Sequence, residues 1–275
     1  MALFSAVLYG IVDFVGGRIS RDINGIALAL YVQVFGLAAM LVLASVMPGT
    51  MSAEGFIWGI VSGVGSGIAI MFLYTGMGKG KISLVVPLAA VIGAGIPVLI
   101  GIAFLGERPS TAALLGIVLV LSSVWMVSRG GDSGCNQPMA GFSDCLIAGL
   151  GVAIQYAAVA HTSASAGIWP IVANRAASIV VVFAYGRFTG ATLTIPRQYA
   201  FSALWIGVTA SVSLALYLSA TRLSMLTIAV VLASLYPVIP TMLAIWILKE
   251  KITGMQKLGL VCAAIAVAMI AAPAQ

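Results

Sequence analysis

The sequence predicts an all-α membrane protein with ten transmembrane helices, arranged as two inverted five-helix repeats around a central pocket. Of its 275 residues, 62% are apolar and only 7% are charged, whereas a soluble domain carries about 25% charged residues. The apolar residues form continuous runs close to the ~20 residues that a helix needs to cross a bilayer. Barrel strands would instead alternate polar and apolar residues. We therefore expect helices, which satisfy their own backbone hydrogen bonds in lipid.

The first five predicted helices fill residues 1–128, and polar or Gly- and Pro-containing breaks separate most of them. The first run carries one acidic residue, Asp13, and no basic residue precedes it. We interpret this run as a spanning helix and not as a cleaved signal. The sequence MPGT at 47–50 ends the second helix, and GERPS at 106–110 separates the fourth helix from the fifth. The predicted spans are 2–19, 25–47, 55–78, 81–105 and 111–128.

The second five predicted helices follow the longest polar segment, which is rich in Gly and Ser and lies near the middle of the chain. We assign this segment, 129–142, to a linker, and residues 143–275 to the second unit. Thr253 and Gln256 have the spacing of a capping box, which opens the last helix. The predicted spans are 143–161, 167–188, 199–221, 225–248 and 255–272.

The two units resemble each other, and this likeness indicates an internal duplication. A shift of 143 residues pairs Pro97 with Pro240 and Glu107 with Glu250. Apolar sequences can match by chance, but here Pro and Glu coincide at one shift. Each unit has five spans, an odd number, so the second unit must enter the membrane upside down. Inverted repeats build many secondary transporters, with the substrate near the midplane between the repeats.

The positive charges predict the topology. They stand in ones and twos beside helix ends, so the net charge of +6 does not indicate a nucleic-acid partner. Only Arg108 and Arg222 lie at even-numbered loops. The cations at odd-numbered loops are Arg18, Arg21, Lys79, Lys81, Arg129, Arg187, Arg197, Lys249, Lys251 and Lys257. This bias places the odd loops in the cytoplasm and both termini in the periplasm of a bacterial inner membrane.

Short motifs in both units resemble the EamA family of the drug/metabolite transporter superfamily. The likeness covers essentially the whole chain, and the order and repetition of the motifs make it specific. The first-helix signature of the family usually contains Trp-Gly, where this chain has Tyr-Gly. The motifs are YGIVDFVGG at 9–17, PLAA at 87–90, IPVL at 96–99, FLGERPS at 104–110, LG at 115–116, LKEK at 248–251 and LG at 258–259.

The resemblance implies a ten-helix carrier in which the first to fourth and the sixth to ninth helices surround a central pocket. The fifth and tenth helices lie at the periphery. Members export amino acids, nucleotide-type metabolites or drug-like cations, and we expect the bacterial amino-acid exporters, including the aromatic amino-acid type, to be the nearest analogues. Well-known members place both termini in the cytoplasm. The superfamily contains both orientations, so we follow the charges of this chain.

Four polar residues lie inside the predicted helices. A shift of 142 residues pairs Asp13 with Gln155 and Gln33 with Arg175, so repeat symmetry predicts that all four converge on one cavity. Arg175 could bind a carboxylate through two hydrogen bonds, or form a buried structural pair, or extend to the membrane surface. Asp13 could bind a cation or a proton, or pair with an arginine of the first loop. Gln33 and Gln155 could offer amides to the same ligand.

Three further side chains complete the predicted substrate site. Tyr156 and Asn174 are direct chain neighbours of two of the four polar residues. Tyr236 is an aromatic candidate for the pocket wall in the ninth helix. Because tyrosines also anchor helices at membrane interfaces, anchoring is the alternative role for both tyrosines.

Prolines inside two predicted helices indicate points of bending. Pro237 and Pro240 interrupt the ninth helix, and Pro97 stands at the matching place in the fourth. Such breaks are tolerated in a membrane only where protein or a cavity covers them. We expect both helices to bend and gate the pocket, the alternative being a static kink.

Two other patterns have simpler explanations than a site. Gly59, Gly63 and Gly67 form a small-residue face, which favours packing within the bundle over dimerisation. Glu107 and Glu250 lie on opposite membrane faces in an inverted repeat, so they cannot form a carboxylate pair. We expect them to cap helices or to pair with neighbouring loop cations, Lys251 in the case of Glu250.

The sequence lacks the features of an enzyme. It has no phosphate-binding GxxxxGK[ST] loop, no credible nucleophile–base set, and one histidine, which does not indicate a metal site. We expect no cofactor and no metal. The predicted function is that of a secondary transporter in a lipid bilayer, which exports small metabolites, first of all amino acids, by alternating access at a midplane pocket. The alternatives are a multidrug or organic-cation exporter and a non-transporting membrane scaffold, and the sequence is compatible with a monomer.

Overall fold

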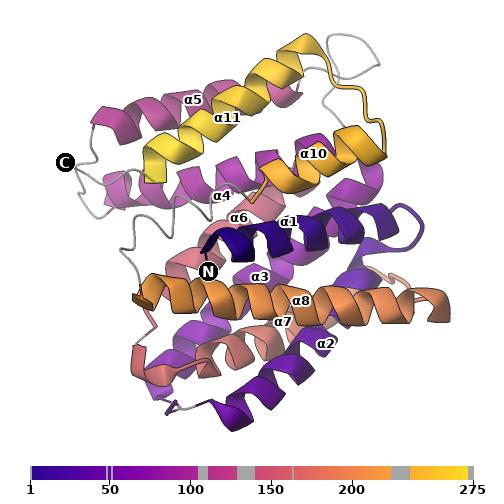
Figure 1. The fold of residues 1–275 in the computed structure, drawn as a ribbon, viewed down its shortest axis with the longest axis vertical. Helices are drawn as coiled ribbons and strands as arrows, with labels where there is room; N and C mark the ends of the chain where they lie inside the picture. Colours follow the sequence, from indigo (N-terminus) through magenta and orange to yellow (C-terminus); the bar gives the residue numbers. More distant parts are fainter. Residues whose placement is uncertain are drawn as a thin grey trace.

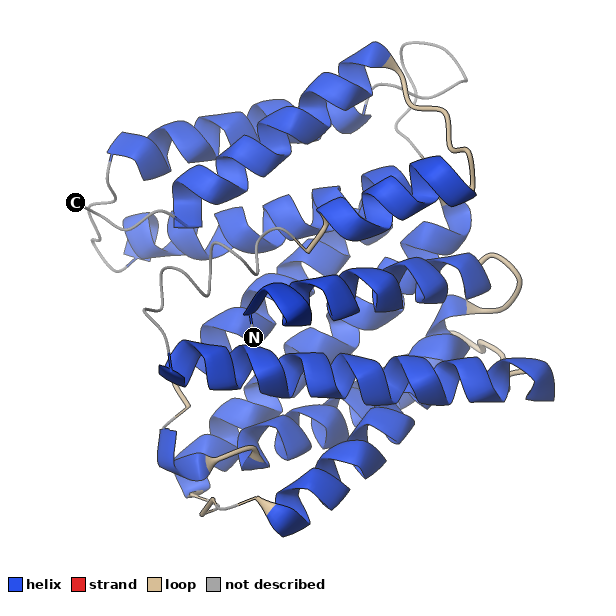
Figure 2. Cartoon of the chain, viewed as in Figure 1, coloured by secondary structure: helices blue, strands red, loops and turns tan. Residues whose placement is uncertain are grey.

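The computed structural model describes residues 2–47, 49–50, 52–104, 111–128, 140–162, 164–223 and 236–271. Within these ranges the chain consists of α-helices, one short 3-10 turn and loops, without a strand (Figure 2). The helices are α1 (Ala2–Ile19), α2 (Gly25–Val46), α3 (Ala53–Lys79), α4 (Ile82–Phe104), α5 (Thr111–Ser128), α6 (Phe142–Ala160), α7 (Trp169–Phe188), α8 (Arg197–Leu223), α10 (Val238–Ile247) and α11 (Gly254–Ala271). The prediction of an all-helical chain is confirmed for the described residues.

Local capping explains why most helix boundaries fall within two residues of the predicted ones. The Asn24 side chain accepts a hydrogen bond from the Ile26 N–H, which is 2.9 Å away, at the start of α2. The predicted capping box at α11 is present: the Thr253 N–H donates to Gln256 Oε1 over 3.0 Å, and the Gln256 N–H donates to Thr253 Oγ1 over 3.3 Å. Such caps satisfy N–H groups that have no partner within the helix.

The predicted ninth helix differs from the structure in its described part. Tyr236 and Pro237 form a turn, and α10 begins only at Val238, with Pro240 as its third residue. A proline in the first turn costs no helix hydrogen bond, because the N–H groups there have no intrahelical partner. The prolines therefore mark the start of a helix and do not kink a continuous one. Residues 225–235, which were predicted to begin the ninth helix, lie outside the described residues.

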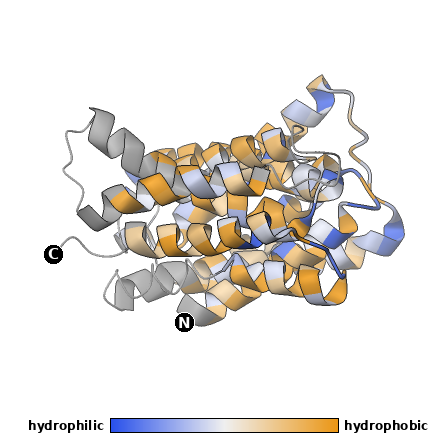
Figure 3. Ribbon diagram, turned by 90° about the horizontal axis from the view of Figure 1, so that it is seen from above, coloured by the Kyte–Doolittle hydropathy of each residue, from blue (hydrophilic) through white to orange (hydrophobic). Residues whose placement is uncertain are grey.

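Five described helices are long and apolar enough to cross a membrane, namely α2, α3, α6, α7 and α8. Shorter apolar helical segments occur at Ile82–Gly93, Val238–Ile247 and Gly254–Met269. Figure 3 shows apolar residues along the helices and hydrophilic residues concentrated toward one end of the bundle. The chain is therefore a multi-pass membrane protein, while the count of ten spans stays a prediction.

Contacts between the two halves of the chain occur in equivalent pairs. When each helix is replaced by its counterpart in the other half, one contact of the pair becomes the other. The contact of α3 with α6 corresponds to that of α8 with α1, and the contact of α3 with α7 corresponds to that of α8 with α2. The contact of α4 with α6 corresponds to that of α10 with α1. The equivalent helices α2 and α7, α5 and α11, and α4 and α10 also contact each other. This pattern is that of a pseudo-twofold arrangement. At one edge of the bundle α5 and α11 lie side by side (Figure 1), where the resemblance placed the fifth and tenth helices.

The glycine face of α3 packs against α7. A Cβ atom added to Gly59 would lie 2.7 Å from the carbonyl oxygen of Pro170, and one added to Gly63 would overlap the backbone of Asn174. Gly67 faces Val181 and Ser178 in the same way. The expectation of packing within the bundle is confirmed, because the helix backbones approach closely where side chains are absent.

Charged side chains tie together the loops at the hydrophilic end of the bundle. Lys79 Nζ lies 2.9 Å from Asp144 Oδ2, which links α3 to α6. Arg18 Nη1 lies 3.5 Å from Asp22 Oδ2, and the Tyr199 hydroxyl of α8 donates to the same carboxylate oxygen over 3.3 Å. The loop after α1 is therefore connected to α8.

Glu250 is the centre of a second connection at this end. Its carboxylate accepts hydrogen bonds from the Ile82 N–H (3.1 Å), the Ser83 N–H (3.0 Å) and the Ser83 hydroxyl (2.6 Å), and it forms an ion pair with Arg21. The expected capping role is confirmed, although the helix that it caps is α4 of the other half. The expected pairing with Lys251 is wrong, since Arg21 is the cation that reaches this carboxylate.

Candidate functional site

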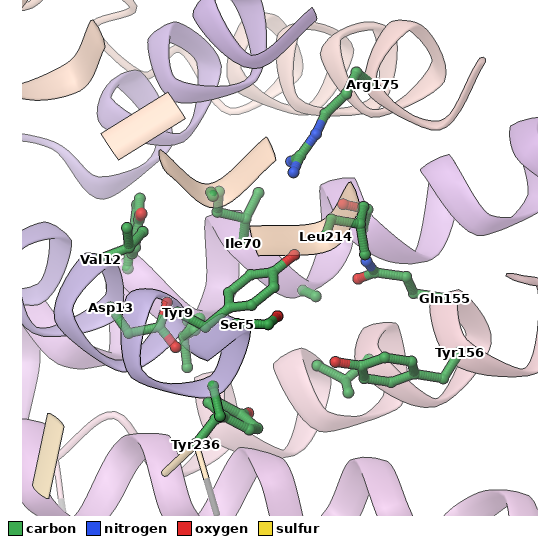
Figure 4. Close-up of a pocket in the computed structure, with 17 residues that line it drawn as sticks. Ser5, Tyr9, Val12, Asp13, Ile70, Gln155, Tyr156, Arg175, Leu214 and Tyr236 are labelled. Atoms are coloured by element: carbon green, nitrogen blue, oxygen red, sulfur yellow. The ribbon is translucent and has the colours of Figure 1, made fainter. Parts of the chain in front are cut away.

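A cavity lies between α1, α3, α6, α7 and α8, beside the turn that precedes α10 (Figure 4). The volume that the centre of a water molecule can occupy in it is about 100 Å³. The lining residues are Ser5, Ala6, Tyr9, Val12, Asp13, Ser66, Ala69, Ile70, Leu73, Tyr74, Val152, Gln155, Tyr156, Arg175, Ala210, Leu214 and Tyr236. Both halves of the chain contribute to the wall, as expected for a site between repeats.

Asp13 provides the carboxylate of the cavity. It lies two-thirds along α1, with 9% of its surface exposed. No hydrogen bond or ion pair joins it to another side chain in the described part of the chain. The two arginines of the first loop bind elsewhere, Arg18 to Asp22 and Arg21 to Glu250. The alternative of a structural pair with these arginines is therefore not found.

Arg175 provides the cation of the cavity. It lies on α7, is 4% exposed, and extends its guanidinium toward the cavity in Figure 4. Its Nη1 donates to Gln33 Oε1 of α2. Its Nε–H is buried and has no hydrogen-bond partner among the described residues. The alternative in which this side chain extends to the membrane surface is excluded by its burial.

The acidic side chain of Asp13 and the basic side chain of Arg175 lie on different walls of one cavity. Figure 4 shows Asp13 on one side and the Arg175 guanidinium on the other, and no ion pair joins them. A charge within a bilayer costs several kcal/mol unless it is compensated. Because Asp13 and Arg175 are both buried at the edge of the cavity, we expect a ligand in the cavity to contact both side chains.

The four repeat-related polar residues lie near one another, but they do not all reach the cavity. Gln33 and Arg175 form a hydrogen bond with each other, which places both on the pseudo-twofold axis. Asp13 and Gln155 both line the cavity. Three of the four residues therefore line the cavity and Gln33 does not, and the binding roles of all four stay predictions.

Two of the predicted site residues lie behind the cavity wall. Gln33 is fully buried, and Asn174 is 1% exposed. Asn174 Nδ2 donates to Ser62 Oγ over 2.8 Å, and the Ser62 hydroxyl donates to the Gln155 carbonyl oxygen over 3.2 Å. Asn174 therefore supports the segment of α6 that carries two lining residues, Gln155 and Tyr156.

Four tyrosines give the cavity an aromatic wall. Tyr156 and Tyr236 were singled out in the sequence, and the structure places both in the lining. Tyr9 and Tyr74 were not assigned to the site, although both line it and both interact electrostatically with Arg175. Tyr9 precedes Asp13 by four residues, so helical spacing could have placed the two on one face of α1.

The three predicted gating prolines lie in two elements. Pro237 and Pro240 flank the start of α10, directly after the lining residue Tyr236. The helix α1 comes close to them, since a Cβ atom on Gly10 would lie 3.0 Å from Pro240 Cδ. Pro97 lies inside α4, where it removes one backbone N–H from the helix. Gating by these prolines stays a prediction.

Within the described ranges, His, Cys, Asp and Glu do not form a group of three or more that could hold a metal ion.

Comparisons with known proteins agree with this architecture. A model of the EamA-like transporter family matches residues 1–129 and, a second time, residues 140–272. An uncharacterized protein of Methanocaldococcus jannaschii is 30% identical over 130 residues, which cover 46% of this chain and 93% of that protein. A protein of known crystal structure is 14% identical, and the match covers 96% of each chain with a TM-score of 0.57. This last likeness concerns the fold alone.

Proposed function

Because the chain belongs to the EamA-like transporter family, a family of membrane transporters of small solutes, we propose that it exports amino acids across a bacterial inner membrane. The observation that carries this proposal is that an acidic and a basic side chain, Asp13 and Arg175, line one cavity. Arg175 can bind the carboxylate of an amino acid. Asp13 can bind the ammonium group of the same molecule.

The aromatic wall supports a zwitterion with an apolar or aromatic side chain. An ammonium group is attracted to the faces of tyrosine rings as well as to a carboxylate. Tyr9 and Tyr74 line the cavity together with Asp13. A tyrosine hydroxyl can in addition donate a hydrogen bond to a substrate carboxylate.

An organic cation is the second candidate substrate, with Asp13 as its partner. The same tyrosines would favour such a ligand. Arg175 opposes it, because its guanidinium has no carboxylate partner among the described residues and repels another cation. A non-transporting scaffold would need neither buried charge. Amino acids remain the better proposal for these reasons.

Transport would proceed by alternating access between two inverted units, 1–128 and 143–275, joined by the linker 129–142. The double match of the family model and the paired contacts between the halves support this division. The start of α10 and the interior of α4 are the proposed bending points, at Pro237 and Pro240 in one and Pro97 in the other. The ion pair of Glu250 with Arg21 and its hydrogen bonds to α4 would close the cavity at the loop end, and they would have to break when that end opens.

Transport by the purified protein in liposomes tests the proposal. Three probes share one aromatic ring: L-phenylalanine carries both charges, 2-phenylethylamine lacks the carboxylate, and 3-phenylpropionate lacks the ammonium group. We expect the wild type to move phenylalanine fastest, with and without a proton gradient as two arms of the experiment. Faster movement of the amine would favour the organic-cation exporter, and movement of none of the three would contradict the proposal.

A further inference from the structure

We propose that Gln33 decides which charge the cavity accepts, because it holds Arg175 in place without neutralising it. This inference rests on the proposed function, in which the cavity that contains Arg175 binds the substrate. Gln33 is then a positioning residue that acts through Arg175 and does not itself touch the ligand.

Both polar atoms of the Gln33 side chain bond to other protein groups, and the side chain lies out of reach of a ligand in the cavity. Its Oε1 accepts from Arg175 Nη1, and its Nε2 donates to Ser178 Oγ and, over 3.3 Å, to Ser66 Oγ. The side chain is fully buried. It therefore joins α2 to α3 and α7 behind the cavity wall, and of these partners Ser66 and Arg175 line the cavity.

The orientation of the Gln33 amide follows from its partners. A guanidinium group has only donors, so it must face the carbonyl oxygen of the amide. The amide nitrogen then faces Ser66 and Ser178, whose hydroxyl oxygens can accept. The amide cannot rotate by half a turn without placing its NH₂ against the guanidinium. The hydrogen bonds to the two serines thus fix the orientation of the Gln33 amide, and the amide oxygen fixes the position of the Arg175 guanidinium.

The neutrality of this partner is the feature that matters for specificity. A buried arginine is normally paired with a carboxylate. Here its partner is an amide with the same length as a glutamate side chain, and the Arg175 Nε–H remains without a partner among the described residues. Gly36, one turn further along α2, lies against this nitrogen: an added Cβ atom would be 3.5 Å from Arg175 Nε and 2.7 Å from the Ser211 hydroxyl oxygen. The positive charge is therefore available to a carboxylate that enters the cavity.

Replacement of Gln33 by glutamate should reverse the preference. A carboxylate at position 33 would pair with Arg175, and Asp13 would then be the uncompensated charge of the cavity. The variant should accept an organic cation better than a zwitterion. A substitution that only weakened the fold would lower the transport of both ligands together and leave their ratio unchanged.

The test compares the uptake of L-phenylalanine and 2-phenylethylamine by Gln33→Glu in proteoliposomes. Because the new carboxylate would pair with Arg175, the substrate carboxylate would lose its hydrogen bond to this charged group. Such a loss typically costs about 1.4 kcal/mol or more, so we expect the ratio of phenylalanine to amine uptake to fall about tenfold or more. Gln256→Glu is the matched control, because Gln256 is equally buried but lies in the capping box of α11, where glutamate serves as well as glutamine. The control should keep the wild-type ratio.

Two further variants separate the possible failures. Gln33→Met keeps the length of the side chain without its polar atoms, and should lower phenylalanine uptake while sparing the amine; it also serves if the glutamate variant does not fold. If Arg175→Ala abolishes phenylalanine uptake and folded Gln33→Glu keeps the wild-type ratio, the role of Gln33 is refuted while the proposed site stands. If Arg175→Ala has no effect, the proposed site itself is wrong, and the role of Gln33 with it.

Discussion

At the scale of single residues, the site depends on two side chains whose charges have no partner of opposite sign within the described protein. Asp13 has no ion-pair or hydrogen-bond partner there, and Arg175 bonds to a neutral amide. An ionisable group buried at membrane depth without a partner destabilises a protein. Their presence beside a cavity is therefore better explained by a ligand than by stability.

Replacement of Asp13 by asparagine should affect only ligands that carry an ammonium group. We expect the affinity for phenylalanine to fall roughly tenfold or more, because a hydrogen bond between two charged groups is lost. The affinity for 3-phenylpropionate should stay at the wild-type value, since that ligand has no group for Asp13. Titration of both ligands against the purified variant measures the difference, and an equal loss for both would argue against a direct contact.

The symmetry of the sequence predicted which polar residues converge, but not what each of them contacts. The equivalence of Gln33 and Arg175 in the two repeats follows from the sequence, whereas the hydrogen bond between them is known only from the structure. The serines that hold Gln33 come from other helices at unrelated positions. Whether a side chain reaches the cavity or lies behind its wall depends on how those helices pack, so the sequence placed Gln33 in the site itself.

At the scale of elements, the helices follow local signals, and their packing follows the glycines. Caps and breaks fixed most boundaries in advance because they act on neighbouring residues. The start of α10 was missed because the apolar run around Tyr236 continues without a polar break, and only Pro237 marks the turn. The close contact of α3 with α7 was expected from the glycine spacing, whereas the choice of α7 as the partner required the structure.

Replacement of Gly63 by alanine should destabilise the bundle. Its new methyl group would overlap the Asn174 backbone, and overpacking of this kind costs about 1–3 kcal/mol. Thermal unfolding of the purified protein in detergent measures the effect. Gly254→Ala is the control, since a Cβ atom there meets nothing within 4 Å. Equal melting temperatures for the two variants would contradict the close contact of α3 with α7.

Replacement of Glu250 by alanine should loosen the loop end of the bundle. It removes the acceptor for the first turn of α4 and the partner of Arg21, at a cost of about 2 kcal/mol. Glu54→Ala serves as the control, because Glu54 is an exposed acidic residue in the first turn of α3. We expect the control to change the melting temperature far less. A Glu250 variant as stable as the control would show that this connection contributes little.

At the scale of the whole molecule, helices of the two halves pack directly against each other. The described contacts between halves include α3 with both α6 and α7, and their counterparts α1 and α2 with α8. The cavity lies where these helices meet. Movement of one unit against the other would therefore change the cavity directly, as alternating access requires.

The loop charges predict that both termini lie in the periplasm. Alkaline phosphatase fused after Gln275 should then be active, because this enzyme folds only where disulfides form. The same enzyme fused within the polar segment 129–141 should be inactive. The reverse pattern would place the termini in the cytoplasm. The end of the bundle that carries the Lys79–Asp144 and Arg21–Glu250 ion pairs would then face the periplasm.

The central claim is that Arg175 binds the carboxylate of the substrate, and uptake by Arg175→Ala in proteoliposomes tests it most directly. The account predicts that phenylalanine uptake falls roughly tenfold or more, while 2-phenylethylamine uptake is preserved or rises because a repelling charge is gone. Arg175→Lys should retain part of the phenylalanine uptake, since it keeps the charge but not the planar pair of donors. Unchanged phenylalanine uptake by a correctly folded Arg175→Ala protein would contradict the account.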